Sequence, residues 1–274
     1  RHQYPFCWRC HRPLLSYALE RWFVTTTAVQ DQLIKHNRRI NWVPQSIGAG
    51  RMQNWYETLV DWSMSRNRYW GTPLPAWVCD KHAAHIEVIG SFAELAQKVG
   101  KRLPRDFDPH RPHIDQYTWA CPHKDGGVMR RVPEVTDVWH DSGCMPFAQW
   151  HYPFEQKAMI EKGPGRSGKQ FPADYISEAV DQTRGWFFSL QAVSTMLFGK
   201  SPYRNVVVFE FALDEKGRKM SKHLGNVVDP WEAIDAVGAD PIRWFFLTSV
   251  AIGTPYRTSV EVFRETMRRF FLIF

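Results

Sequence analysis

The chain has 274 residues, of which 44% are hydrophobic and 15% aromatic, so it can build one large domain or two smaller ones around a hydrophobic core. Lysine and arginine total 35 against 28 acidic residues, and the resulting net charge of +7 suits an anionic partner such as a nucleotide or RNA without establishing one. The sequence contains neither a run of eighteen apolar residues nor a signal-peptide pattern, so we expect no membrane span.

The first 75 residues carry a cysteine pair followed by mixed secondary structure. Cys7 and Cys10 form a C-x-x-C pair, which supplies half of the four ligands that Zn²⁺ prefers. Residues 21–27 are rich in β-branched and aromatic side chains and predict an extended run, and a polar stretch at about 28–39 predicts a helix. Because the cysteine count of five is odd and no secretory context is visible, a disulfide framework is not expected.

A second group of cysteines and histidines lies between residues 76 and 132. Cys79 and His82 form a C-x-x-H pair, and Cys121 and His123 form a C-x-H pair. Two short chelating pairs brought together by the fold would complete a tetrahedral Cys₂His₂ zinc site. The alternative is that these are scattered surface histidines and inert cysteines. Three further histidines are competing donors: His85, His110 and His113.

The same segment contains a helix with its own start and stop residues. Ser91 and Glu94 form a capping-box start, and Gly100 is suited to the position after the helix, so we predict a helix between them. Because this helix lies between the two halves of the zinc site, residues 76–132 are interpreted as a small inserted metal module. Cys144, farther along, has no nearby partner and is expected to be a buried apolar residue.

From residue 133 onward, strands and helices alternate. Three segments predict strands: residues 135–139, 174–179 and 205–213. An amphipathic helix is predicted from about Asp181 to Phe198, with Gly199 as its end. Asp229 and Asp240 each precede a proline, a pattern that predicts two further helix starts. This order of elements predicts an α/β fold with a parallel sheet.

The predicted strand 205–213 leads through a turn at 214–217 into a basic loop. The loop reads Lys219-Met220-Ser221-Lys222-His223-Leu224-Gly225-Asn226. Two lysines three residues apart on a loop that leaves a strand can meet a polyanion together, with Met220 as an apolar anchor between them. Taken alone, the pattern also fits a solvated basic turn.

Four segments together carry a family resemblance. They are residues 65–75 (SRNRYWGTPLP), 137–143 (DVWHDSG), 181–187 (DQTRGWF) and 219–226 (KMSKHLGN). In this order they resemble the isoleucyl-tRNA synthetases, a family of class I aminoacyl-tRNA synthetases, whose KMSKS loop has here the form KMSKH. The valyl and leucyl relatives share the architecture, but their counterparts of the first two segments read differently. The resemblance extends over essentially the whole chain, although nothing matches a HIGH-type signature.

The resemblance implies an α/β fold that is the second half of a class I, Rossmann-like catalytic domain, with an inserted zinc module and the start of a helical domain. The implied divisions are a return from an editing insertion with half a zinc site at 1–27, a catalytic-core segment at 28–75, the zinc module at 76–132, the catalytic core with the KMSKH loop at 133–250, and the start of the anticodon-binding helices at 251–274. The chain is thereby interpreted as an internal piece of a longer polypeptide, and we expect the piece alone to be inactive.

The implied reaction is activation of isoleucine by ATP, with Mg²⁺, to the aminoacyl adenylate, followed by transfer to tRNA(Ile). Lys222, and secondarily Lys219, would neutralise charge on the phosphates. Trp139 and Trp186 would form walls of the isoleucine pocket. The remaining implied contacts to ATP or the adenylate are Glu178, Asp181, Gln182, Met220 and Ser221.

Some residues depart from the family pattern. His82 and His123 occupy positions that are often cysteine in the family's second zinc site, although imidazole is an ordinary Zn²⁺ ligand. His140 stands where an aromatic residue is usual. The resemblance implies a cytoplasmic enzyme that is monomeric at full length. The alternatives are a valyl- or leucyl-type synthetase, or a zinc-containing RNA-binding module without catalysis.

Overall fold

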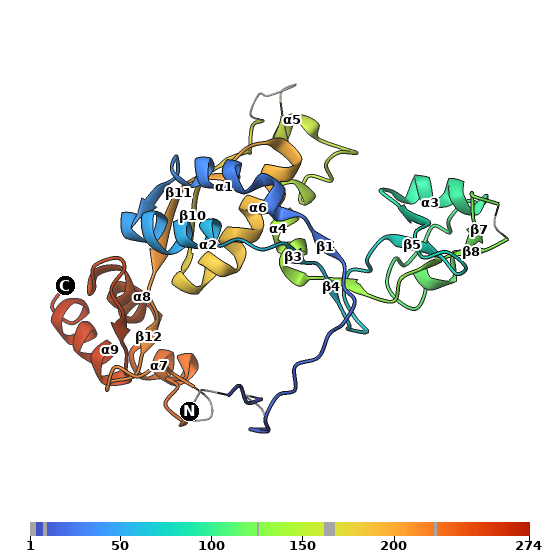
Figure 1. Ribbon diagram of the computed structural model, residues 1–274. Coiled ribbons are helices and arrows are strands. Elements are labelled where there is room, and N and C mark those ends of the chain that lie inside the picture. The colour runs from blue at the N-terminus through green and yellow to red at the C-terminus, as the bar shows by residue number, and fades with distance from the viewer. Residues whose placement is uncertain (1–3, 8–9, 125, 162–167, 222–223) are drawn as a thin grey trace. The chain divides into compact units, whose positions relative to one another are not determined.

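The structure is a computed structural model that describes residues 4–7, 10–124, 126–161, 168–221 and 224–274. It divides into two compact units, each assembled from two stretches of the chain (Figure 1). Unit 1 comprises Arg1–Val24 and Asp61–Asp137, and unit 2 comprises Thr25–Val60 and Val138–Phe274. The five-segment division expected from the sequence is finer than these two units and stays a prediction.

Unit 1 is built on a four-stranded antiparallel sheet in the order β6-β5-β8-β7, with α3 (Phe92–Val99) beside it (Figure 1). Two antiparallel pairs, β1 with β3 and β4 with β9, complete its strands. The strands are β1 Phe23–Val24, β3 Trp62–Ser63, β4 Ser65–Arg66, β5 Ala76–Cys79, β6 Ile86–Val88, β7 Trp119–Ala120, β8 Val128–Arg131 and β9 Val135–Thr136. A short 3-10 turn, η3 (Ile114–Gln116), precedes β7.

The core of this sheet combines aromatic, aliphatic and cysteine side chains. Trp77 of β5 is 1% exposed, and its Nε1 donates to the carbonyl oxygen of Tyr117 at 2.7 Å. Leu95 from α3 and the two buried cysteines, Cys79 and Cys121, belong to the same cluster. The packing therefore draws together parts of the chain about forty residues apart, which local sequence alone could not bring into contact.

The predicted start and end of α3 are confirmed. The Ser91 hydroxyl accepts a hydrogen bond from the Glu94 N–H at 3.1 Å, and Gly100 ends the helix at φ +67°. The Glu94 carboxylate reaches back to the N–H of Gly90 rather than that of Ser91. The N-cap bond thus forms as the sequence indicates, and the reciprocal bond is displaced by one residue.

Unit 2 contains a parallel sheet in the order β10-β11-β2, formed by Ala173–Ala179, Tyr203–Phe209 and Asn41–Val43. The predicted parallel sheet is confirmed by the register, in which Glu178 pairs with Val208 and Val206 pairs with Trp42. After β10 the chain forms a 3-10 turn, η4 (Val180–Arg184), and then α6 (Trp186–Phe198), which returns it to β11. Gly199 ends α6 at φ +60°, as predicted.

Helix α6 is the central packing element of unit 2, because every residue from Phe187 to Thr195 is buried. Phe187 packs edge-on against Trp42 of β2, with ring centroids 5.7 Å apart. Helix α4 (Val138–Ala148) lies against α6 so closely that a Cβ at Gly143 would be 2.9 Å from the Ser189 carbonyl oxygen. The strand predicted at 135–139 is therefore wrong beyond Thr136, because the chain enters α4 at Val138 and packs on α6.

Unit 2 has further helical elements before β10, of which η1 and α1 contact α6. They are η1 Thr26–Val29, α1 Gln30–Asn37, the π-type turn η2 Ile47–Met52, α2 Gln53–Glu57 and α5 Lys157–Ile160. The helix predicted at about 28–39 corresponds to α1.

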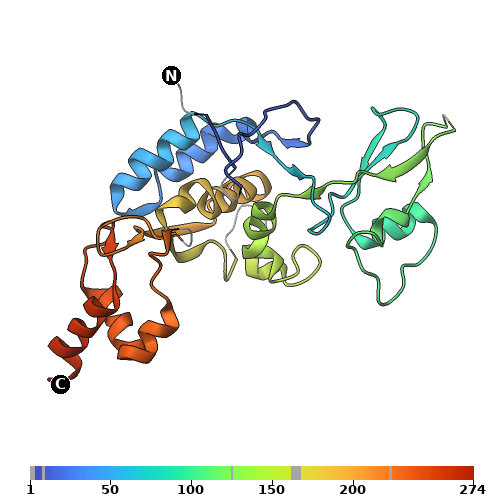
Figure 2. The same cartoon turned by 90° about the horizontal axis from the view of Figure 1, so that it is seen from below.

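The C-terminal part of unit 2 gathers three helices around a short parallel pair of strands (Figure 2). The elements are β12 Ala212–Leu213, α7 Pro230–Val237, α8 Ala239–Thr248, β13 Tyr256–Arg257, α9 Val260–Thr266 and the π-type turn η6 Met267–Phe271. The strand predicted at 205–213 is therefore split between β11 and β12. In the hydrophobic core of this C-terminal part, Phe245 and Phe263 pack with their ring centroids 5.3 Å apart.

One of the two predicted Asp–Pro helix starts is confirmed. Asp229 caps α7, and its carboxylate accepts hydrogen bonds from the N–H groups of Trp231 and Glu232. The other is wrong, because α8 begins at Ala239 with Gly238 before it, so Asp240 lies in the first turn instead. A carboxylate in the first turn still favours the helix through its dipole, which explains the similar sequence pattern.

Candidate functional site

The carboxyl ends of the parallel strands β10 and β11 lie at the same edge of the sheet, where Ala179 pairs with Phe209. Glu178 is exposed at the end of β10, and Asp181 and Gln182 follow it in η4. This edge is where open α/β sheets bind ligands. The structure therefore brings three of the predicted adenylate contacts to the edge that the fold class favours.

Trp139 lies beside Gly185, the residue that precedes α6, and Trp186 follows Gly185 in the chain. The Gln182 side-chain oxygen accepts a hydrogen bond from the Trp186 N–H at 2.9 Å, so this amide satisfies a free backbone donor at the start of the helix. The Trp186 Nε1 donates to the carbonyl oxygen of Ser142 in α4 at 3.1 Å. A Cβ on Gly185 would be 3.0 Å from the Trp139 ring and 2.6 Å from the Gln182 oxygen. Both predicted pocket walls are thus held beside the strand-end edge.

The described part of the lysine loop places its first lysine on an aromatic ring. Lys219 is exposed, and its Nζ lies 4.7 Å from the ring centroid of Phe211. The backbone of Lys219 bridges to Leu213 across the turn, in which Gly217 adopts φ +73°. Lys222, the lysine expected to contribute most, lies outside the described residues together with His223.

Met220 and Ser221 each contact other residues of unit 2. Met220 lines an apolar pocket of about 310 Å³ together with side chains of α7, α8 and α9, including Ile234, Phe246 and Phe263. The Ser221 N–H donates to the side-chain oxygen of Asn226 at 2.8 Å. Met220 is therefore an apolar anchor of the loop, as its place between the two lysines predicts.

Asp214 is a nearly buried carboxylate at the start of the turn, and no sequence pattern had singled it out. One of its oxygens accepts from the N–H groups of Lys216 and Arg218 at 3.0 and 2.8 Å. The other accepts from the Arg218 Nε at 2.8 Å and from the Asn226 Nδ2 at 2.9 Å. The bond from Asn226, followed by that from the Arg218 N–H, lowers the pKa of Asp214 to about 2, so the carboxylate is ionised at neutral pH.

The candidate metal centre of unit 1 contains two cysteines and one histidine. The ligand atoms of Cys79, His85 and Cys121 all lie within 4.8 Å of one another, and the Cys121 Sγ is 3.5 Å from the His85 Nδ1. A tetrahedral zinc with bonds of about 2.0–2.3 Å holds its ligand atoms about 3.3–3.8 Å apart. Both cysteines are buried and His85 is half-buried, so the set fits a Zn²⁺ ion after a small contraction.

The histidine in this group is His85, one of the competing donors, whereas the predicted His82 and His123 lie at its edge. The His85 N–H donates to the His82 carbonyl oxygen at 3.0 Å, and this turn carries the His85 ring toward Cys121. The His123 ring stacks on His85 with centroids 3.8 Å apart, and the exposed His82 ring lies 5.2 Å from it. Both exposed histidines thus lie against the His85 ring, whereas the group of mutually close ligand atoms contains His85 alone of the three.

The other cysteines lie outside this centre. Cys10 is exposed and Cys7 half-buried, and among the described residues no further ligand group joins them. Cys144 is half-buried rather than buried, and its Sγ lies 3.7 Å from the His140 Nε2. The expectation of a buried apolar residue without a nearby partner at Cys144 is therefore wrong.

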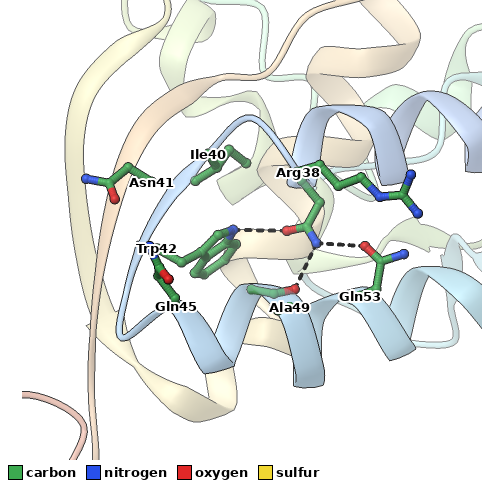
Figure 3. Close-up of a pocket in the computed structure, with 9 residues that line it drawn as sticks. Arg38, Ile40, Asn41, Trp42, Gln45, Ala49 and Gln53 are labelled. Carbon is green, nitrogen blue, oxygen red and sulfur yellow. Dashed lines mark hydrogen bonds between the residues drawn. The ribbon is translucent and has the colours of Figure 1, made fainter.

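A separate polar pocket of about 300 Å³ borders β2 in unit 2 (Figure 3). Its wall is organised by Asn37, whose side-chain amide accepts from the Trp42 Nε1 at 3.0 Å and donates to the carbonyl oxygen of Gly48 at 2.9 Å. A Cβ on Gly48 would be 2.2 Å from the Trp42 ring, so only glycine permits this approach. None of the predicted site residues lines this pocket.

Comparison with known proteins identifies a family and its members. The family profile described as tRNA synthetases class I (I, L, M and V) matches residues 15–256. The chain is 51% identical over 271 residues to an isoleucine–tRNA ligase of Thermus thermophilus, covering 99% of this chain and 25% of the relative. It is 49% identical over 269 residues to an isoleucine–tRNA ligase of Clostridium acetobutylicum, covering 98% and 25%. The chain thus spans about a quarter of the length of these curated relatives.

Solved structures support the fold. A methionyl-tRNA synthetase of Mycobacterium tuberculosis in complex with methionyl-adenylate matches 97% of this chain and 40% of its own, with a TM-score of 0.59 at 19% sequence identity. The LeuRS of Agrobacterium radiobacter K84, in a ternary complex with tRNA, matches 77% and 27%, with a TM-score of 0.57 at 22% identity. Across the described residues, no helix is both long and apolar enough to cross a membrane.

Proposed function

The chain belongs to the class I tRNA synthetases (I, L, M and V), and from this premise we propose that it is part of an isoleucine–tRNA ligase. The observation that carries the proposal is the 51% identity, over 99% of the chain, to the isoleucine–tRNA ligase of Thermus thermophilus. The proposed reaction joins the carboxylate of isoleucine to the α-phosphorus of ATP with loss of pyrophosphate. The adenylate is then attacked by a hydroxyl at the 3′ end of tRNA(Ile), and AMP leaves.

The strand-end edge of unit 2 is proposed to bind the adenylate. The reaction needs no protein nucleophile, so the chain contributes positioning and charge stabilisation. Glu178 and Asp181 are exposed there and can accept hydrogen bonds from hydroxyl groups of a nucleotide. The Gln182 side chain accepts a hydrogen bond from the Trp186 N–H, which fixes the start of α6 beside the ends of the strands. The position at the carboxyl end of parallel strands supports these roles.

The two lysines are proposed to bind the phosphates of ATP, with Mg²⁺ arriving as part of the ATP complex. Lysine is a compact, mobile point charge and suits a loop that closes over its substrate. The contact of Lys219 with Phe211 supports this role, because an exposed cation–π contact is worth only about 0.5–1 kcal/mol and a phosphate could displace it. Lys222 is proposed to meet the charge that develops as pyrophosphate leaves.

Trp139 and Trp186 are proposed as walls of the isoleucine pocket. Two rigid aromatic faces suit a branched apolar side chain that offers no hydrogen-bonding group. The approach of the Trp139 ring to Gly185 and the bond from the Trp186 Nε1 to Ser142 of α4 support this assignment. An apolar pocket separates isoleucine from valine by only about 10–200-fold, a general limit for which this enzyme family is itself the standard example.

The Cys79, His85 and Cys121 group is proposed to hold a structural Zn²⁺, with His82 or His123 as the fourth ligand. Such an ion would cross-link the strand β5 to the turn before β8 and stabilise the fold of the small sheet. The buried thiols and the half-buried imidazole are the donor types that Zn²⁺ prefers. We propose that 76–132 form a zinc module and that the helices after residue 251 begin a helical domain that contacts tRNA.

A pair of substitutions in the full-length protein that carries these residues tests the proposal. Lys222→Ala should lower the maximal rate of isoleucine-dependent ATP–pyrophosphate exchange by about 10²–10³-fold and leave the KM for isoleucine nearly unchanged. Trp186→Ala should instead raise that KM and weaken discrimination against other apolar amino acids. Lys35→Ala and Trp231→Ala, at exposed positions on α1 and α7, are the matched controls. If Lys222→Ala raised only the KM for isoleucine, the phosphate-binding role would be wrong.

A further inference from the structure

The lysine loop is held at its base by two side chains that the proposed reaction does not use. Asp214 precedes the loop and Asn226 follows it, and their side chains meet in a 2.9 Å hydrogen bond across twelve residues of sequence. Asn226 also donates to the carbonyl oxygen of Lys219 at 3.2 Å and accepts from the Ser221 N–H at 2.8 Å. One amide therefore fixes the backbone on both sides of Met220, immediately before Lys222.

The first half of the loop is held independently by its backbone. The Asp214 N–H donates to the Arg218 carbonyl oxygen, and the Gly217 N–H donates to the Asp214 carbonyl oxygen, both at 2.9 Å. In the second half, the Leu224 N–H donates to the Ser221 carbonyl oxygen at 3.0 Å, and the Val228 N–H donates to the Met220 Sδ at 3.5 Å. The side chain of Asn226 adds bonds to Lys219 and Ser221 and links this half to the carboxylate of Asp214.

We infer that Asp214 and Asn226 form a clasp that holds the backbone of Lys219–Ser221 in place for ATP binding, and that both are positioning residues of the adenylation reaction. The inference rests on the proposed function, because it assigns how that function's lysine loop is aimed. Met220 lines the apolar pocket of about 310 Å³ and gives the loop a second anchor, which is hydrophobic where the clasp is hydrogen-bonded. A loop fixed at its base and anchored at Met220 can carry the lysine side chains to the phosphates without searching many backbone conformations.

The carboxylate of Asp214 is ionised at neutral pH, so it can accept the hydrogen bond from Asn226 there. The pKa of Asp214 is lowered to about 2, first by the bond from Asn226, so the carboxylate keeps its full acceptor capacity at neutral pH. Asn226 could not be replaced by an aspartate without placing two carboxylates in contact. The order of the two residues therefore matters: the carboxylate precedes the loop and the amide follows it.

The test compares a single variant and a doubly exchanged variant of the full-length protein, measured by isoleucine-dependent ATP–pyrophosphate exchange. Asn226→Asp should lower kcat about 10- to 100-fold, because it removes two donated bonds and sets two carboxylates against each other, while the KM for isoleucine stays within about twofold. The exchanged pair Asp214→Asn with Asn226→Asp should recover part of this loss, since an amide again meets a carboxylate. Asp240→Asn, at an exposed aspartate of α8 paired only with Arg243 on the surface, is the matched control and should behave as wild type.

Hydrogen exchange of the backbone amides separates this inference from the proposed function. In Asn226→Asp the amides of residues 218–226 should lose protection, while those of α6 keep theirs. A wild-type protein without isoleucine-dependent exchange would overturn the proposed function, whereas the amide protection would still report on the clasp. The clasp itself is contradicted if Asn226→Asp keeps wild-type kcat and loop protection, or if kcat, the KM for isoleucine and α6 protection all deteriorate together without recovery in the double variant.

Discussion

Gly185→Ala is the substitution that should disturb the proposed isoleucine pocket most directly without removing any functional group. The added Cβ would lie 2.6 Å from the Gln182 side-chain oxygen and 3.0 Å from the Trp139 ring. Because carbon atoms pack at about 3.5–4.0 Å, the ring must move by about 0.5–1 Å. The Gln182 oxygen must also move, and it would then lose its 2.9 Å bond from the Trp186 N–H.

The expected cost has two parts. Loss of the Gln182 bond should destabilise the start of α6 by about 1 kcal/mol, and overpacking costs about 1–3 kcal/mol where neighbours cannot move. Trp139 is 39% exposed, so its ring can swing outward, and the stability loss should lie near the lower end of this range. A displaced pocket wall should then reduce kcat/KM for isoleucine by about 10–100-fold, mainly through KM.

The assay is isoleucine-dependent ATP–pyrophosphate exchange, accompanied by thermal unfolding. Gly50→Ala is the matched control, because a Cβ at Gly50 meets nothing within 4 Å. It should keep wild-type kinetics and unfold at the same temperature or slightly higher. If Gly185→Ala kept a wild-type KM and kcat, Trp139 would not be a wall of the isoleucine pocket and the geometry proposed around Gly185 would be refuted.

Two further predictions concern metal and pH. Chelation of the proposed zinc, or Cys121→Ser, should expose Trp77 and Trp119 of unit 1, seen as a red shift of tryptophan fluorescence together with loss of one zinc per chain. Cys144→Ser should keep the metal, and unchanged zinc content in Cys121→Ser would contradict the proposed ligand set. Asp214 has a folded-state pKa of about 2, below its value in an unfolded chain of about 3.9, so its stabilisation is present above about pH 4 and is lost as pH falls through 2. The difference in unfolding midpoint between wild type and Asp214→Asn should accordingly be constant from pH 7 to 5 and shrink between pH 4 and 2; a difference that grew on acidification would show the opposite linkage.

The elements that the sequence predicted well are those defined by local chemistry. Helix α3 has its Ser91 cap and its Gly100 end, and α7 has its Asp229 cap, each directly next to the helix that it bounds. The parallel sheet was also predictable, because a strand, a helix and another strand in succession require a crossover connection. In each case the residues that determine the structure lie in one contiguous stretch of the sequence.

The elements that the sequence predicted poorly depend on distant contacts. Val138 and Trp139 have high strand propensity, yet they begin α4 because Gly143 allows that helix to lie directly on α6. The choice among histidines at the metal centre depends on the turn from His82 to His85, which spacing alone could not reveal.

The candidate site shows the same division. The KMSKH loop and the strand-end residues could be located because each is a short contiguous pattern. The bond between Asp214 and Asn226 could not, because it joins residues twelve apart on either side of a loop whose closure is set by tertiary structure. An aspartate at the start of a glycine-ended turn is a recognisable pattern, but the residue that meets its second oxygen is not.

The amino-acid dependence of ATP–pyrophosphate exchange by the full-length protein is the most direct test of the central claim. The account predicts exchange that requires isoleucine, with kcat/KM for isoleucine exceeding that for valine by about 10–200-fold, the range expected of an apolar pocket distinguishing one methylene in this enzyme family. Leucine and methionine should support exchange less well than isoleucine. Exchange that ran best with valine, leucine or methionine, or that did not depend on an amino acid at all, would contradict it.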